Sequence, residues 1–100
     1  MKVLREERSM EPCIEGGFFG YYFYLDGPVD EAFIQGLEHL GSLSYLPALK
    51  KPFFLVRGAR FAIRGQVGDE FCKVGVEAND RQLLERLRGE LEQAGPFGEE

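Results

Sequence analysis

Two cysteines, Cys13 and Cys72, and one histidine, His39, carry the thiol and imidazole chemistry of this chain. A thiolate beside an imidazole would make a nucleophile, but neither cysteine lies near His39 in the sequence. Two thiols and one imidazole also leave a four-ligand zinc site incomplete without carboxylates. Cys13 has no basic neighbour to lower its pKa, and Cys72 falls on the apolar side of an expected strand. We therefore expect no catalytic residue, no metal and no cofactor, and an enzyme using Cys13 or His39 is the weakest alternative.

A second set of side chains combines aromatic rings with basic groups. Tyrosine, phenylalanine and arginine are enriched where protein surfaces bind each other. Rings beside cations also serve sheets that bind single-stranded nucleic acid. The residues that we expect to act together in this way are Tyr22, Tyr24, Arg57, Arg60, Arg64, Phe71 and Lys73.

The rings of this set begin in an aromatic segment over residues 17–25. Six of its nine residues are phenylalanine or tyrosine, which favours a strand. The odd-numbered positions, from Phe19 to Leu25, are slightly more apolar, so we expect them to face the core. Tyr22 and Tyr24 then face the other side of the sheet.

Residues 53–77 predict three antiparallel strands joined by turns at Gly58-Ala59 and Gly68-Asp69. The turns set a register in which apolar or small residues meet on one side of the sheet. The basic residues, with Phe71, collect on the other side, and Glu77 is placed to offset Arg60. The pairs expected on the apolar side are Val56–Phe61, Phe54–Ile63, Ile63–Val74, Phe61–Val76 and Gly65–Cys72.

Two amphipathic helices are expected on either side of these strands in the sequence. The first spans residues 28–40, with Gly27 as N-cap, Pro28 at the first helical position and Gly41 after its end. The second follows Asn79 as N-cap, presents Leu83, Leu84, Leu87, Leu91 and Ala94 on one side, and stops at Gly95-Pro96. Residues 42–46 between them fit a short strand.

Two helices with apolar faces and one apolar sheet face predict an α+β fold, a two-layer sandwich in the order strand, helix, three-stranded antiparallel meander, helix. The arrangement resembles a ferredoxin-like or split β-α-β fold. It departs from the ferredoxin-like order because no strand follows the second helix. We expect a single domain over residues 1–100 with its ordered core at about 16–94, and with 1–12 and 96–100 peripheral.

Composition narrows the classes of function. The chain has 100 residues and a formal charge of −5, which argues against a nucleic-acid coat protein. No apolar run is long enough for a membrane span. The N-terminus is charged and lacks the apolar stretch of a secretory signal, so we expect a cytoplasmic protein. Charge is uneven along the chain, because residues 39–68 contain five bases and no acid.

Two helices cover one side of a sheet, so the other side, which we call the helix-free face, meets water, a partner or a ligand. The first hypothesis is a solvated face whose arginine stems lie over rings. The second is a protein interface, in a homodimer or with an unidentified partner subunit. The third is single-stranded nucleic acid or a small anion, although no ribonucleoprotein motif is present. We expect an interaction or accessory domain that associates through this face.

Overall fold

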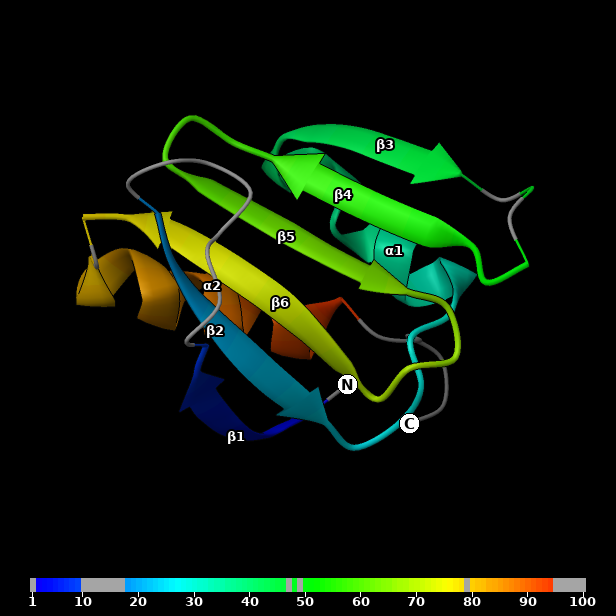
Figure 1. The fold of residues 1–100 in the computed structure, drawn as a ribbon, viewed down its shortest axis with the longest axis horizontal. Coiled ribbons are helices and arrows are strands. Elements are labelled where there is room, and N and C mark those ends of the chain that lie inside the picture. The colour runs from blue at the N-terminus through cyan, green and yellow to red at the C-terminus, as the bar shows by residue number, and fades with distance from the viewer. Residues whose placement is uncertain (1, 10–17, 47, 49, 79, 95–100) are drawn as a thin grey trace.

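The computed structural model describes residues 2–9, 18–46, 48, 50–78 and 80–94, and these form one antiparallel sheet with helices on one side (Figure 1). The sheet has six strands in the order β1-β2-β6-β5-β4-β3. The elements in chain order are β1 (Val3–Arg8), β2 (Phe18–Leu25), α1 (Glu31–Gly36), the 3-10 helix η1 (Glu38–Leu40), β3 (Ser42–Leu46), β4 (Phe53–Arg57), β5 (Phe61–Gln66), β6 (Phe71–Glu77) and α2 (Arg81–Gln93). The α+β class is confirmed.

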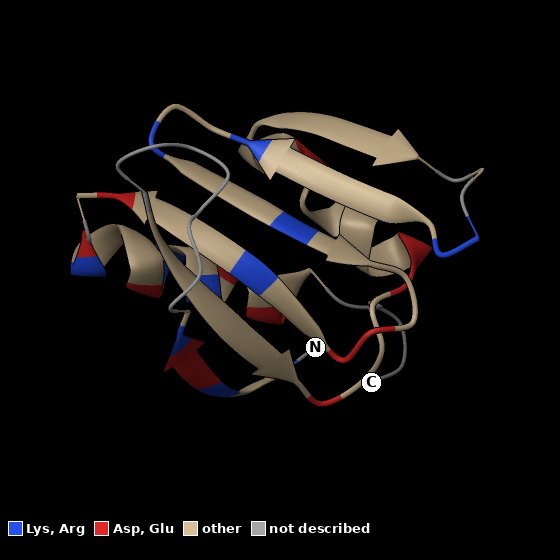
Figure 2. Ribbon diagram, in the orientation of Figure 1, with Lys and Arg blue, Asp and Glu red and all other residues tan. Residues whose placement is uncertain are grey.

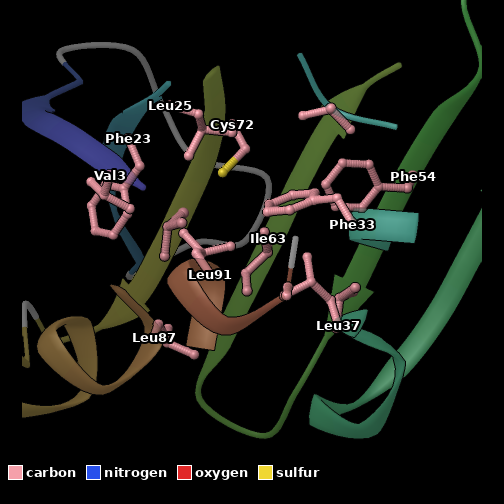
Figure 3. Packing of buried hydrophobic residues seen from close by; sticks show 14 of the residues in the cluster. Val3, Phe23, Leu25, Phe33, Leu37, Phe54, Ile63, Cys72, Leu87 and Leu91 are labelled. Carbon is pink, nitrogen blue, oxygen red and sulfur yellow. The ribbon is translucent and has the colours of Figure 1, made fainter. Parts of the chain in front are cut away.

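The aromatic strand β2 presents its odd-numbered side chains to the core, as expected. It pairs with β6, with Phe23 opposite Cys72 and Tyr21 opposite Val74. Phe23 is fully buried and Leu25 is 2% exposed. In Figure 3 Phe23 lies beside Val3, and Ile63 lies between Leu91 of α2 and Leu37 at the end of α1. This layer of apolar contacts holds the sheet against α1 and α2.

The meander is confirmed as β4, β5 and β6, but its first hairpin has a different register. Ile63 lies opposite Val74 as expected. Val56, however, lies opposite Ile63, whereas the sequence predicted Phe61. The Gly58 N–H donates to the Phe61 carbonyl over 2.9 Å, so the turn is made by residues 59–60. Because the register moves by two residues, every side chain keeps its predicted face.

Gly58 does not supply the turn conformation that the sequence suggested. A Cβ at this position would lie 2.3 Å from the Phe61 ring. The glycine is therefore needed for the close approach of that ring. In the second turn, by contrast, Gly68 has φ +97°, a conformation that side chains with a Cβ rarely adopt.

The first helix is shorter than predicted and begins later. Asp30 is its N-cap, and the Asp30 carboxylate accepts a hydrogen bond from the Phe33 N–H over 2.9 Å. Val29 cannot join the helix because its N–H donates to the Asp69 carbonyl, and its own carbonyl accepts from Gly68. The predicted helix over 28–40 is therefore a loop, then α1, then η1.

The second helix is capped one residue later than predicted. Asn79 lies outside the described residues, and the Asp80 carboxylate accepts from the Leu83 N–H over 3.1 Å. Most of the predicted apolar stripe faces the sheet, since Leu84, Leu87 and Leu91 are buried and Leu83 is half-buried. The expected helix stop at residues 95–96 and the tail at 96–100 also lie outside the described residues.

Two further strands complete the sheet beyond the four of the predicted layer. Residues 42–46 form the short strand β3, which pairs with β4. The N-terminal segment, expected at the periphery, supplies β1, which lies beside β2. Its Val3 is only 4% exposed and belongs to the core. The layer is therefore six strands wide rather than four.

Candidate functional site

The helix-free face is defined by the side chains that alternate with the core positions. One row of paired residues crosses the whole sheet. It runs through Glu7, Tyr22, Lys73, Arg64, Leu55 and Ser44. Figure 2 shows the two basic positions of this row side by side in the middle of β6 and β5. The register thus places Tyr22, Lys73 and Arg64 on one side of the sheet.

Three of the predicted rings form a cluster on this face. The Tyr22 and Phe71 centroids lie 5.7 Å apart with planes at 75°. Tyr24 lies 6.2 Å from Phe71 and 6.4 Å from Tyr22, with planes tilted by 44° and 40°. All three side chains are half-buried. Rings packed at such distances and angles hold one another in place.

The edge strand β1 adds two charged residues to this ring cluster. The Arg5 guanidinium carbon lies 4.1 Å from the centroid of the Tyr24 ring. The Tyr24 hydroxyl donates to the Glu7 carboxylate over 2.9 Å, and this bond raises the pKa of Tyr24. Arg5 and Glu7 are not among the site residues predicted from the sequence, because nothing local marks residues 3–8 as a strand.

The side chain of Lys73 is buried among the neighbouring side chains of the helix-free face. It is 7% exposed, and its Nζ lies 5.7 Å from the Tyr22 centroid. Beside it is a groove of about 220 Å³, lined among others by Phe53, Arg64 and Phe71. Arg64 is half-buried, so Arg64 and the rings are the predicted site residues that a binding partner can contact here.

The other two predicted arginines lie away from this groove. Arg57 is exposed at the end of β4, opposite Ala62. This pair lies on the same face as the Leu55–Arg64 pair, two residues further along the strands. Arg60 is in the β4–β5 turn and contacts Glu77 over 3.3 Å and Asp80 over 2.9 Å. Glu77 therefore offsets Arg60 as expected. The role of Arg60 is to tie the turn to the start of α2.

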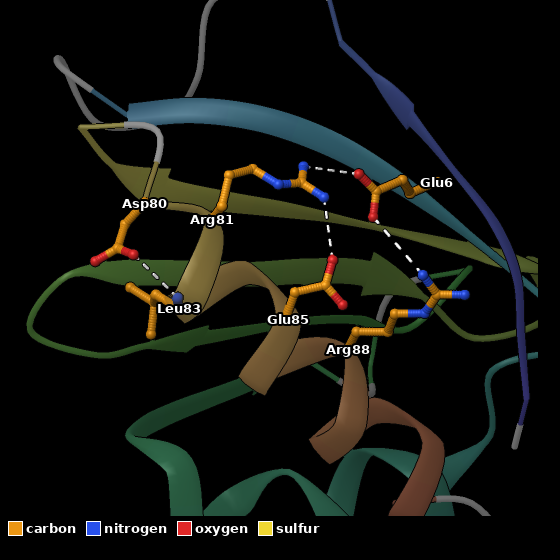
Figure 4. A network of polar contacts seen from close by, with 6 residues as sticks. All are labelled: Glu6, Asp80, Arg81, Leu83, Glu85 and Arg88. Atoms are coloured by element: carbon orange, nitrogen blue, oxygen red, sulfur yellow. Dashed lines mark hydrogen bonds and ion pairs between the residues drawn. The ribbon is translucent and has the colours of Figure 1, made fainter.

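The edge strand β1 is fastened to α2 by a network of charges (Figure 4). Arg81 lies 2.9 Å from Glu6 and 3.0 Å from Glu85, and Arg88 lies 4.0 Å from the other Glu6 oxygen. The hydrogen bond to Glu6 raises the pKa of Arg81. These contacts fix the strand that carries Arg5 and Glu7, and so position the edge of the ring cluster.

The residues considered for catalysis are not brought together. The Cys72 thiol is fully buried, and burial raises its pKa to about 12. His39 is largely exposed and lies 3.1 Å from Glu90, beside a hollow of about 520 Å³ between the helices. Cys13 lies outside the described residues. Within residues 2–9, 18–46, 48, 50–78 and 80–94, no three His, Cys, Asp or Glu side chains form a group able to hold a metal.

Comparison with known proteins gives no relative. No family model, no curated protein and no solved structure matches this chain. Among the described helices, none has the length and apolar character needed to cross a bilayer.

Proposed function

We propose that this chain is an interaction domain that binds an acidic segment of a partner protein through the helix-free face. The observation that carries the proposal is the cluster of Tyr22, Tyr24 and Phe71, with ring centroids 5.7–6.4 Å apart, beside Arg64 and Arg5. Half-buried rings next to arginine are the groups that contribute most to binding energy at protein interfaces.

The charges near the cluster favour an acidic partner over a second copy of the same face. Arg64 lines the groove, and Arg57 lies on the same face two residue pairs further along the β4–β5 ladder. A two-fold dimer joined face to face would place the same set of charges on both sides of the interface, so the basic groups of both copies would share one interface. Carboxylates of a different protein would instead pair with them and increase the rate of association.

The geometry of the rings argues against nucleic acid as the occupant. Arg5 already covers one side of the Tyr24 ring at 4.1 Å. The rings are also tilted against one another by 40–75°, whereas successive bases need ring faces that are free to stack. Nucleic acid on this face is therefore the alternative that the experiment must exclude.

The test is a binding experiment with a charge-matched control. The wild-type chain and two variants, Arg64→Glu and Arg86→Glu, are used to isolate binding proteins from the native extract. Arg86 is exposed on α2, so its reversal changes the net charge equally on the opposite layer. We expect to isolate an acidic protein with wild type and with Arg86→Glu, but not with Arg64→Glu. Once purified, this protein should bind wild type and Arg86→Glu with similar affinity and Arg64→Glu more weakly.

Three results would contradict the proposal. One is equal loss of the partner with both variants, which would mean that only net charge matters. Another is retention of oligothymidylate at low salt with steep release as salt rises, which would assign the face to nucleic acid. The third is a dimer of the chain that Arg64→Glu or Tyr22→Ala weakens, which would assign the face to a second copy.

We further propose that the topology is related to the split β-α-β arrangement. Each neighbouring pair in the sheet is antiparallel, so β2 and β3 run in the same direction with β6, β5 and β4 between them. The chain passes from β2 to β3 through α1. A connection of this kind through a helix supports the relation, and the ferredoxin-like strand order has no further support.

A further inference from the structure

The two edges of the sheet differ in how they are protected against pairing with another strand. The β1 edge reads Val-Leu-Arg-Glu-Glu-Arg and has a register irregularity between Val3 and Arg5. Charged side chains and bulges are the usual means of blocking an edge. The β3 edge reads Ser-Leu-Ser-Tyr-Leu, without a charge, and its five residues pair with β4 in unbroken register.

The outer side of β3 also leaves apolar surface uncovered. Among the described residues no strand pairs with this side. Leu46 is 50% exposed, one of two large apolar side chains described as exposed. Leu43 and Tyr45 point to the helix side and are only half-buried at the end of the core. An edge that is regular, uncharged and partly apolar is competent to pair with another strand.

We propose that β3 pairs antiparallel with β3 of a second copy of this chain, centred on Ser44, so that two six-stranded sheets become continuous. This association uses a different surface from the acidic partner proposed above, and it rests on different observations. The axis of two-fold symmetry passes between the two Ser44 residues and is perpendicular to the sheet. Both helix layers therefore lie on the same side of the joined sheet.

The sequence of β3 is complementary to itself in this register. Leu43 faces Tyr45 of the second copy, Ser42 faces Leu46, and Ser44 faces Ser44. All five residues of each strand are paired, and no charged side chain is placed opposite another. The Leu–Tyr pairs continue the apolar row that Val56 and Phe54 make with β3 inside each chain. A charged partner strand would find no counter-charge on this edge, which is why we assign a second copy.

The test places charges at the centre of the proposed pair. Ser44 is exposed, so Ser44→Lys and Ser44→Glu leave the core unchanged, and a thermal melt of each variant verifies folding. In sedimentation over a range of concentrations, wild type is expected to shift to twice its 11.3 kDa mass. Each variant alone places like charges opposite each other and raises the dimer dissociation constant by about fivefold. An equal mixture of the two variants pairs opposite charges and restores association.

Controls separate this inference from the proposed function. Gln82→Lys adds the same charge on exposed α2 and is expected to leave the dimer unchanged, as is Arg64→Glu on the helix-free face. The inference is overturned by a wild-type chain that stays monomeric at every concentration. It is also overturned if both Ser44 variants dimerise like wild type, if their mixture associates no better than either alone, or if Arg64→Glu dissociates the dimer.

Discussion

Gly36 and Gly89 allow one substitution to be compared in two packing environments. Both are helical, Gly36 at the end of α1 and Gly89 within α2. A Cβ on Gly36 would lie 2.6 Å from the Ala94 carbonyl oxygen and 2.9 Å from the Ala94 Cα. A Cβ on Gly89 would have no atom within 4 Å. The helix layer is therefore sensitive to a methyl group at one position and tolerant at the other.

The magnitudes follow from these distances. Alanine within a helix is about 0.5–1 kcal/mol more favourable than glycine, so Gly89→Ala is expected to raise the free energy of unfolding by that amount. At Gly36 the contacted atoms are backbone, and ordinary contact begins at 3.4 Å, so α1 and the end of α2 must separate by about 0.8 Å. Such overpacking costs about 1–3 kcal/mol. Because Gly36 is the last residue of α1, it also gains less from alanine than Gly89 within α2, so the two variants are expected to differ by at least this cost.

Urea unfolding followed by circular dichroism measures both variants against wild type. We expect Gly89→Ala to unfold at higher urea than wild type, and Gly36→Ala to unfold at lower urea than Gly89→Ala. In thermal melts the separation is about 4–8 °C for each 1 kcal/mol. A Gly36→Ala variant as stable as Gly89→Ala would refute the close approach of α1 to Ala94, and with it the packing of the helix layer.

Three further predictions concern the helix caps and the buried thiol. Asp30→Ala removes the acceptor for the Phe33 N–H and is expected to lower the free energy of unfolding by about 1 kcal/mol in urea, with Asp30→Asn nearly neutral. The Leu83 N–H and Arg60 lower the pKa of Asp80 from its ordinary value of 3.8. The ionised carboxylate therefore stabilises the fold above pH 3.8, and this stabilisation is lost as the pH falls through the lower pKa of the folded state. In an acid titration, the free energy of unfolding of Asp80→Asn should fall less steeply than that of wild type. Cys72 should resist iodoacetamide at pH 8 in the folded chain and react in urea, as peptide mass spectrometry would show, and rapid labelling without denaturant would contradict its burial.

The sequence predicted the two sides of the sheet better than it predicted the strand pairing. Alternation alone places Phe23 in the core and Tyr22 outside, because a strand has a period of two residues. The turn after β4 lies one residue later than the sequence predicts, because Gly58 makes room for the ring of Phe61 and is not itself a turn residue. The prediction of which side chains share a face is still correct, because the register of β4 and β5 moves by an even number of residues.

What the sequence could not predict depends on contacts between distant residues. Strand β1 has charges at most positions, so no local pattern distinguishes it from a solvated segment. It is held by the Val3 N–H bond to Glu92, 89 residues away, and by the Glu6 contacts with Arg81 and Arg88. For the same reason Arg5 and Glu7 were absent from the predicted site. The start of α1 was also misplaced, since the bonds of Val29 to the β5–β6 turn decide it.

The uneven charge of the chain gives the two proposed associations opposite dependence on salt. Each copy carries a formal charge of −5, so two copies repel as a whole, while the β3 edge that joins them has no charge of its own. Added salt screens this repulsion and strengthens the pairing. An acidic partner is attracted locally by Arg64, which lines the groove, and the same screening weakens that contact. The domain can then hold a partner on its face and a second copy at its edge at once, because Ser44 on β3 and Tyr22 on β2 are separated by β4, β5 and β6 across the width of the sheet.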